Sequence, residues 1–253
     1  SAGIIDDSLI GAKNVLNFGY ILFLLLREKK ESPDLIEKLV KKWVIMSILT
    51  QRYSASTESQ FDVDIRRLMD AEDLVNYIEL ELSRNLTDTF WDSILVEKFN
   101  TSVASSPYWK TYLIAQIALN DNAFLSKDMK VRTLVEGRGD VHHIFPKNYL
   151  QKNGKNNKSL YNQIANFALI QTETNLQISD MSPEEYMQIV NIQCTSKGNE
   201  IGSINEKDKL LENLKINCIP EALYLMNVDD YDSFLKQRRI FMAKKIKDYY
   251  NTL

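Results

Sequence analysis

Hydrophobic residues recur with the period of an α-helix through most of the first 130 residues. Over 35–49 they lie three or four positions apart, which places them on one face of a helix that begins after Ser32. Ser32 and Ser106 are each followed by a proline, a combination typical of helix starts. The same pattern predicts further helices over 8–28, 58–83, 88–99 and 107–119.

The pattern changes near Gly137, where glycines become frequent and long helical stretches give way to short segments. A first strand is predicted over 141–149, although Pro146 restricts its second half to a sheet edge or a loop. The hydrophobic run 164–170 predicts a second strand. The polar segment 151–162 between them predicts a long exposed loop.

Two further helices are predicted after the strands. Ser182 and Glu185 have the spacing of a capping box, which predicts a helix start there. The last helix is predicted over 229–251, because acidic residues lie at its start and lysines near its end, as the helix dipole favours. The expected fold class is mainly α, with a helical domain over 1–130 and a second domain over 131–253 that contains the strands.

Composition excludes several classes of protein. The hydrophobic fraction of 44% and the charged fraction of 26% are ordinary for a globular protein. The longest apolar run, 20–26, is far shorter than the roughly 18–20 residues of a membrane span, so no membrane partner is expected. No secretory signal is visible, and Cys194 and Cys218 form no CxxC pair, which predicts a cytoplasmic protein. Residues 1–3 resemble a cloning remnant, so we expect a fragment of a longer protein.

Charge is distributed unevenly along the chain. The net charge of -3 argues against a nucleic-acid partner, because domains that bind nucleic acids are usually basic. Between 141 and 172, however, there are lysines and no acidic residue. The basic residues of this region and just upstream of it are Lys147, Lys152, Lys155, Lys158, Lys130, Arg132 and Arg138. Local charge therefore favours a polyanion in this part of the chain.

The chain has 2 histidines, and they are adjacent, His142 and His143. Neighbouring residues on a strand point to opposite sides, so one imidazole can face a metal ion and the other a substrate. A histidine pair alone is more often a packing or surface feature than a site. Here it is followed in order by Pro146, Asn166 and Asn175. Phosphodiester hydrolysis needs a base that activates water and a cation that offsets charge on the phosphate, and these residue types can supply both.

This arrangement resembles the HNH endonucleases, the ββα-metal family. The resemblance implies that His143 is the general base and that His142 and Asn175 bind the metal ion. It also implies that Asn166 ties the loop carrying the base to the second strand. The implied architecture is a mainly α protein, a helical bundle with a small embedded ββα-metal core.

Segment 140–187 is most similar to the C-terminal nuclease region of GmrSD-type, modification-dependent restriction proteins. The shared features are His-Ile-Phe-Pro, Ile-Ala-Asn-Phe-Ala-Leu and Pro-x-x-Tyr, the last at 183–186. Segment 43–64 is similar to the helical region before that nuclease. The resemblance implies a DNA endonuclease of bacterial restriction or anti-phage defence, acting on plain or modified DNA. The N-terminal NTP-hydrolysing domain of such proteins has no counterpart here and is expected to be a missing partner domain.

The expected cofactor is one divalent metal ion, Mg²⁺ or Mn²⁺, with Ni²⁺ and Zn²⁺ as alternatives. His142 and Asn175 are both neutral ligands, which favours the transition metals unless phosphate oxygens or a carboxylate complete the shell. Asp140 and Asp180 are the nearest carboxylates, but neither occupies a motif position.

Contacts to DNA phosphates are expected from Arg138, Lys147, Lys155 and Lys158. Such contacts position a duplex without reading its sequence. Arg238 and Arg239 are expected on a solvated face of the last helix, and segment 52–54 is expected to be structural. Two other functions stay open, a module that binds modified nucleic acid without cutting it and a helical scaffold that docks the missing domain. The sequence predicts no oligomeric state.

Overall fold

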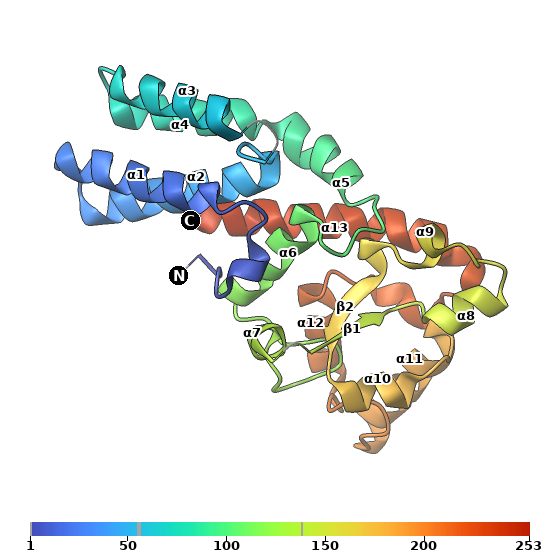
Figure 1. Ribbon diagram of the computed structural model, residues 1–253. Coiled ribbons are helices and arrows are strands. Elements are labelled where there is room, and N and C mark those ends of the chain that lie inside the picture. Colours follow the sequence, from blue (N-terminus) through green and yellow to red (C-terminus); the bar gives the residue numbers. More distant parts are fainter. Residues whose placement is uncertain (1, 55–56, 138) are drawn as a thin grey trace.

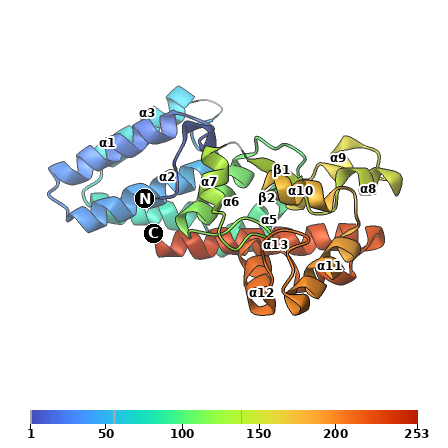
Figure 2. The same cartoon turned by 90° about the horizontal axis from the view of Figure 1, so that it is seen from below.

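The chain is mainly helical, as predicted, and the computed structural model describes residues 2–54, 57–137 and 139–253. Within these residues the strands form a two-stranded sheet (Figure 1). A lobe at one end consists of α1 (Asn14–Glu28), α2 (Pro33–Thr50), α3 (Thr57–Met69) and α4 (Leu74–Asn85). The sheet lies at the other end, and the long helix α13 (Tyr231–Thr252) extends from one part to the other (Figure 2).

The helix starts that are predicted after Ser32, Ser106 and Ser182 are confirmed. They belong to α2, to α6 (Pro107–Ala118) and to α11 (Pro183–Ser196). In each, the serine hydroxyl accepts a hydrogen bond from a backbone amide of the first turn. At α11 the Glu185 carboxylate accepts from the Ser182 amide and completes the predicted capping box. The last helix is also confirmed, since α13 covers almost the whole predicted range.

One helix prediction in the lobe is wrong, and another helix is confirmed with a later start. The segment 58–83 is not one helix, because α3 ends at Met69 and α4 starts after Asp73. The Asp73 side chain accepts a 2.9 Å hydrogen bond from the amide of Asn76 and so caps a new helix. α1 starts later than expected, because a short 3₁₀ turn, Asp7–Leu9, precedes it.

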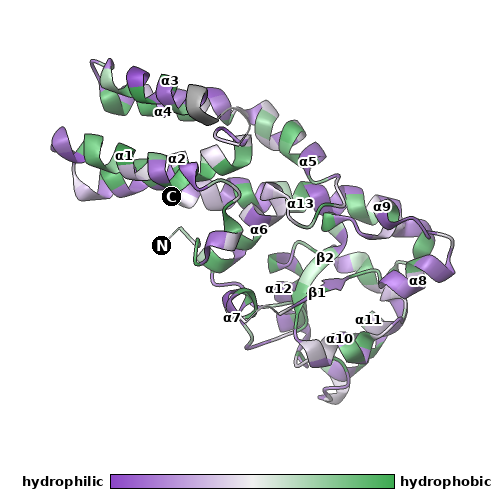
Figure 3. Cartoon of the chain, in the orientation of Figure 1, coloured by the Kyte–Doolittle hydropathy of each residue, from purple (hydrophilic) through white to green (hydrophobic). Residues whose placement is uncertain are grey.

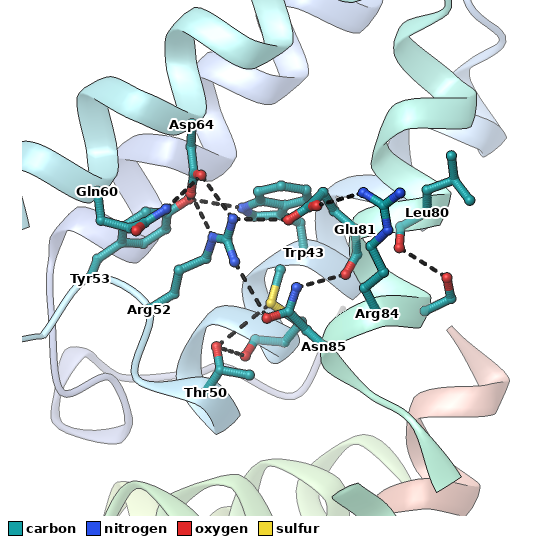
Figure 4. A network of polar contacts seen from close by, with 12 residues as sticks. Trp43, Thr50, Arg52, Tyr53, Gln60, Asp64, Leu80, Glu81, Arg84 and Asn85 are labelled. Atoms are coloured by element: carbon teal, nitrogen blue, oxygen red, sulfur yellow. Dashed lines mark hydrogen bonds and ion pairs between the residues drawn. The ribbon is translucent and has the colours of Figure 1, made fainter. Parts of the chain in front are cut away.

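A buried polar network joins α2, α3 and α4 (Figure 4). Arg52 donates from Nε and Nη2 to the Asp64 carboxylate at 2.5 and 2.8 Å, and from Nη2 to Glu81 at 3.1 Å. The Tyr53 hydroxyl donates to Asp64 at 2.9 Å and accepts from the Trp43 indole at 3.2 Å. Asp64 is fully buried, so these donors replace the hydrogen bonds to water that its side chain loses on folding. The structural role expected for 52–54 is confirmed.

The C-terminal helix packs on the N-terminal half of the chain. α13 lies against α6 and against a π-helical turn, Phe90–Ile94, that leads into α5 (Leu95–Lys98). The ring of Tyr250 lies 5.4 Å from that of Trp91. The Tyr249 hydroxyl donates a 2.6 Å hydrogen bond to the carbonyl of Ala2. The division into 1–130 and 131–253 stays a prediction, and α13 bridges the two segments.

The sheet consists of β1 (Asp140–His143) and β2 (Phe167–Ile170), paired antiparallel. Both strands are shorter than predicted. β1 ends at His143 because Pro146 caps α8 (Lys147–Lys152), and β2 starts after a 3₁₀ turn, Ile164–Asn166. The register places His142 opposite Ala168 and His143 opposite Phe167.

Short helices surround the sheet. They are α7 (Val131–Glu136), α8, α9 (Lys158–Tyr161), α10 (Thr172–Ile178) and α12 (Lys207–Ile216). The long exposed loop predicted over 151–162 is therefore partly wrong, because it contains the end of α8 and all of α9. Hydrophilic and hydrophobic residues alternate along α3 and α4, as expected for helices with one buried face (Figure 3). No helix in the described ranges is long and apolar enough to cross a membrane.

We predict that Asp64→Ala lowers the free energy of unfolding by about 3 kcal/mol or more, because it leaves Arg52 without its main acceptor in a buried place. Urea unfolding followed by circular dichroism measures this. The control is Asp248→Ala, which removes an ion pair with Lys244 whose side chains are 69% and 59% exposed. That loss should be below about 1 kcal/mol. Equal losses in the two variants would contradict a structural role for the network.

Candidate active site

The two histidines end β1 and point to different sides of it, as their adjacent positions predict. His142 is buried and its ring lies 6.2 Å from that of Phe124. His143 is half-buried, and its ring meets Phe167 edge-on at 5.0 Å. Both nevertheless line one pocket of about 240 Å³, whose walls also include Pro146 and Lys147.

Asn175 reaches the same pocket from the middle of α10. Its Oδ1 lies 2.7 Å from Nδ1 of His142. The strand and the following helix therefore bring together the two residues expected to bind a metal ion.

Asn166 joins the chain after His143 to the start of β2. It is fully buried, and its Oδ1 accepts a 2.8 Å hydrogen bond from the amide of Phe145. Its Nδ2 donates to the carbonyls of Phe145 and Tyr161 at 3.0 and 3.3 Å. Its own carbonyl accepts from the amide of Ile144 at 2.8 Å. The contact between Asn166 and the histidine-bearing loop is thus present as expected.

Two further residues hold the backbone on either side of this contact, one after His143 and one before Asn166. The Tyr186 hydroxyl, from the Pro-x-x-Tyr segment, donates a 2.9 Å hydrogen bond to the carbonyl of Ile144. Arg238 donates to the carbonyl of Ala165 at 2.8 Å. Arg238 is fully buried, so its expected place on a solvated helix face is wrong. Its spacing from Phe234 and Met242 along α13 is that of a core position, a signal that was present in the sequence.

Asn162 is a site residue that the sequence analysis missed. Its Oδ1 lies 3.1 Å from Nε2 of His143. It follows α9 in a segment rich in asparagine and lysine, where nothing in the sequence distinguishes it from Asn153, Asn156 or Asn157.

Burial keeps both imidazoles neutral at ordinary pH. Burial lowers the pKa of His142 to about 4, with the charge of His143 acting in the same direction and the hydrogen bond to Asn175 opposing it. Burial also lowers the pKa of His143, against the hydrogen bond to Asn162 and together with the charge of Lys147. A neutral imidazole is the form that can accept a proton or bind a metal ion.

The predicted phosphate contacts have different environments. Lys147 is exposed at the pocket, with Nζ 5.5 Å from the centre of the Tyr161 ring, and Lys158 is exposed at the start of α9. Lys155 forms an ion pair with Asp232 at 3.0 Å and is partly buried. Its side chain is therefore already paired within the fold. Arg138, the remaining candidate, lies outside the described residues.

The residues present fit only part of a metal ion's coordination shell. His142 Nδ1 and Asn175 Oδ1 lie 2.7 Å apart at one pocket, so a metal ion bound by both would replace the hydrogen that joins them, and water or phosphate oxygens would have to supply the rest of the shell. In the described residues no group of three or more His, Cys, Asp and Glu could hold a metal ion. Asp180 is paired with Lys152. His142 Nε2 is buried without a hydrogen-bond partner, so the outer contact that usually orients a metal-binding histidine is missing there.

Comparisons with known proteins assign no function. No protein-family model matches the chain, and no solved structure matches it. The chain is similar to the uncharacterized protein MJ0686 of Methanocaldococcus jannaschii, with 27% identity over 234 residues. The alignment covers 86% of this chain and 38% of that protein, so the chain spans well under half of the relative's length.

The low pKa of His142 predicts a loss of stability in acid. Its ordinary pKa of 6.5 applies to the unfolded chain and about 4 to the folded one. Below pH 6.5 the unfolded state binds a proton that the folded state does not. The free energy of unfolding therefore decreases as the pH is lowered from 6.5 to about 4, and above pH 6.5 this group has no effect on it. Lowering the pH from 7 to 5 should therefore reduce the free energy of unfolding by about 2 kcal/mol through this group.

Urea unfolding at pH 7 and pH 5, compared between the unmodified chain and His142→Gln, measures this effect. The glutamine carries no charge at either pH, so the variant should lose less stability on acidification. The comparison uses the change with pH and not the absolute stability, which any substitution at this buried position alters. An equal change in both proteins would contradict a buried neutral His142.

Proposed function

We propose that the chain is a divalent-metal-dependent DNA endonuclease of the HNH type. The observation that carries this proposal is the meeting of His142, His143 and Asn175 at one pocket, with the backbone between the strands held by Asn166. The order β1, β2, α10 along the chain is that of a ββα unit. A neutral base, two neutral metal donors and a fixed backbone are the parts that phosphodiester hydrolysis needs.

In the proposed reaction, the His143 imidazole accepts a proton from water as the water oxygen attacks phosphorus. The bond between phosphorus and the 3′ oxygen then breaks. The lowered pKa of His143 keeps it unprotonated near neutral pH, so the base is ready without a prior loss of a proton. Phe167 contacts the ring edge-on and Asn162 lies within hydrogen-bond distance of its Nε2, and these two contacts limit the orientations of the ring.

His142 and Asn175 would hold the metal ion. When bound, the ion would offset the negative charge that develops on the phosphate and on the leaving oxygen. Because the pKa of His142 is about 4, protons compete little for its ring near neutral pH. These two neutral donors favour Mn²⁺, Ni²⁺ or Zn²⁺ where water completes the shell, whereas phosphate oxygens of the substrate in the shell would also suit Mg²⁺.

The proposed substrate is DNA, plain or modified. Lys147 at the pocket and Lys158 on α9 are placed to contact phosphates, whereas Lys155 is engaged with Asp232. We assign the chain to a cytoplasmic restriction or anti-phage defence protein whose NTP-hydrolysing domain lies outside this chain. The long unaligned remainder of the archaeal relative is compatible with additional domains.

The first test is cleavage of supercoiled plasmid with Mg²⁺, Mn²⁺, Ni²⁺ or Zn²⁺, on plain and glucosylated-cytosine DNA. We expect nicking that requires a metal ion and that falls about 10²- to 10⁴-fold in His143→Ala, because the base is removed. Asn175→Ala should instead need a higher metal concentration. The control Lys209→Ala removes an exposed ion pair with Glu212 and should cleave normally.

Other outcomes separate the alternatives. Salt-sensitive DNA binding without cleavage would favour a module that senses nucleic acid. Neither binding nor cleavage would favour a scaffold for another domain. Identical cleavage by the unmodified chain and His143→Ala would refute the assigned base.

The lysines allow a matched test of the DNA-binding face. Lys147→Ala should weaken binding to a labelled duplex and reduce the dependence of log K on log salt by about one unit, because one phosphate contact is lost. Lys155→Ala should leave binding unchanged, because that lysine is paired with Asp232. Fluorescence anisotropy over a salt series in EDTA measures both. If Lys155→Ala lost more affinity for the duplex than Lys147→Ala, the assignment of Lys147 to the DNA-binding face would be contradicted.

A further inference from the structure

Asn162 links the candidate base to the helical half of the chain. Its Oδ1 lies 3.1 Å from His143 Nε2, and its Nδ2 donates a 3.2 Å hydrogen bond to the carbonyl of Ser102. Ser102 belongs to the segment between α5 and α6. This segment is fixed beside Asn162 by a second hydrogen bond, from the amide of Ile164 to the carbonyl of Thr101 at 2.9 Å.

These two contacts fix which way the Asn162 amide faces. The Ser102 carbonyl can only accept a hydrogen bond, so the NH₂ group of Asn162 must face it. The amide oxygen therefore faces His143, and it too can only accept. The hydrogen atom between them must then come from Nε2 of a neutral His143. The second ring nitrogen, Nδ1, consequently carries the free lone pair, and none of the hydrogen bonds among the described residues involves it.

We infer that Asn162 is a positioning residue for His143, fixing its tautomer so that Nδ1 is the basic atom. The contact to Ser102 makes the helical half part of the site, because the orientation of the amide depends on that carbonyl. A half-turn of the ring about its Cβ–Cγ bond would present the carbon Cε1 to Asn162 in place of Nε2 and would lose this hydrogen bond. The catalytic consequence rests on the proposed nuclease function, whereas the tautomer does not.

The second pair in the site provides a control. Asn175 faces His142 in a similar way, at 2.7 Å, but is not part of the Asn162–Ser102 link. The chain contains 2 histidines, so each ring can be followed separately by nitrogen NMR of the chain labelled with ¹⁵N-histidine, with His142→Gln for assignment. The spectra are recorded at one pH, at which both rings are neutral.

We expect His143 in the unmodified chain to be a single tautomer with its hydrogen on Nε2. In Asn162→Ala it should become a mixture of tautomers while His142 is unchanged, and Asn175→Ala should affect His142 only. Asn162→Asp keeps an acceptor oxygen and should restore the Nε2 tautomer, which a purely structural role would not explain. The cleavage rate at saturating DNA should fall about 10- to 100-fold in Asn162→Ala with little change in KM.

Hydrogen on Nδ1 of His143 in the unmodified chain would overturn the inference. So would an unchanged single tautomer in folded Asn162→Ala, or an Nδ1 tautomer in Asn162→Asp if the alanine variant does not fold. The NMR measurement needs no cleavage. Inactivity of the unmodified chain would therefore count against the nuclease alone, and an unchanged tautomer would count against Asn162.

Discussion

The hydrogen bonds of Asn166 are the interaction on which the candidate site depends. Two strands of four residues give a sheet too small to be stable without help from its surroundings. Asn166 uses both ends of its carboxamide to bind the backbone of Phe145 and so closes the loop that follows His143. Because this carboxamide is fully buried, each of these bonds would be costly to leave unmade. The position of the candidate base follows from this closure.

The rest of the fold reinforces the same few residues. Arg238, on the long C-terminal helix, binds the carbonyl of Ala165 immediately before Asn166. Asn162 connects His143 to Ser102, in the helical half of the chain. The helix that carries Arg238 also packs against α5 and α6, which flank Ser102. The site is therefore supported from both halves of the sequence, although its own strands are short.

Local signals in the sequence were sufficient for the long helices. Serine–proline starts and hydrophobic spacing predict α2 and α6, and the opposite charges at its two ends predict α13, because these features act within a few residues. The same signals failed over 58–83, where Asp73 caps a second helix inside a continuous periodic pattern. Both strands are predicted in the right places, but their predicted ranges are too long. After β1 the chain turns into α8 at Pro146, and β2 begins only after a 3₁₀ turn.

The residues of the candidate site came from a motif resemblance, and the structure brings them together. Asn162 and the pairing of Lys155 with Asp232 could not be foreseen, because each depends on a contact between distant parts of the chain. The burial of the two histidines could not be predicted either, although it lowers the pKa of both imidazoles and keeps them neutral near pH 7.

The central claim, that the imidazole of His143 is the base, is tested most directly by chemical rescue. The experiment measures cleavage of a labelled duplex by His143→Gly at increasing concentrations of added imidazole, with the preferred metal ion. The account predicts a rate that rises with imidazole in the variant and does not change in the unmodified chain. Cleavage by His143→Gly as fast as by the unmodified chain, without imidazole, would contradict it.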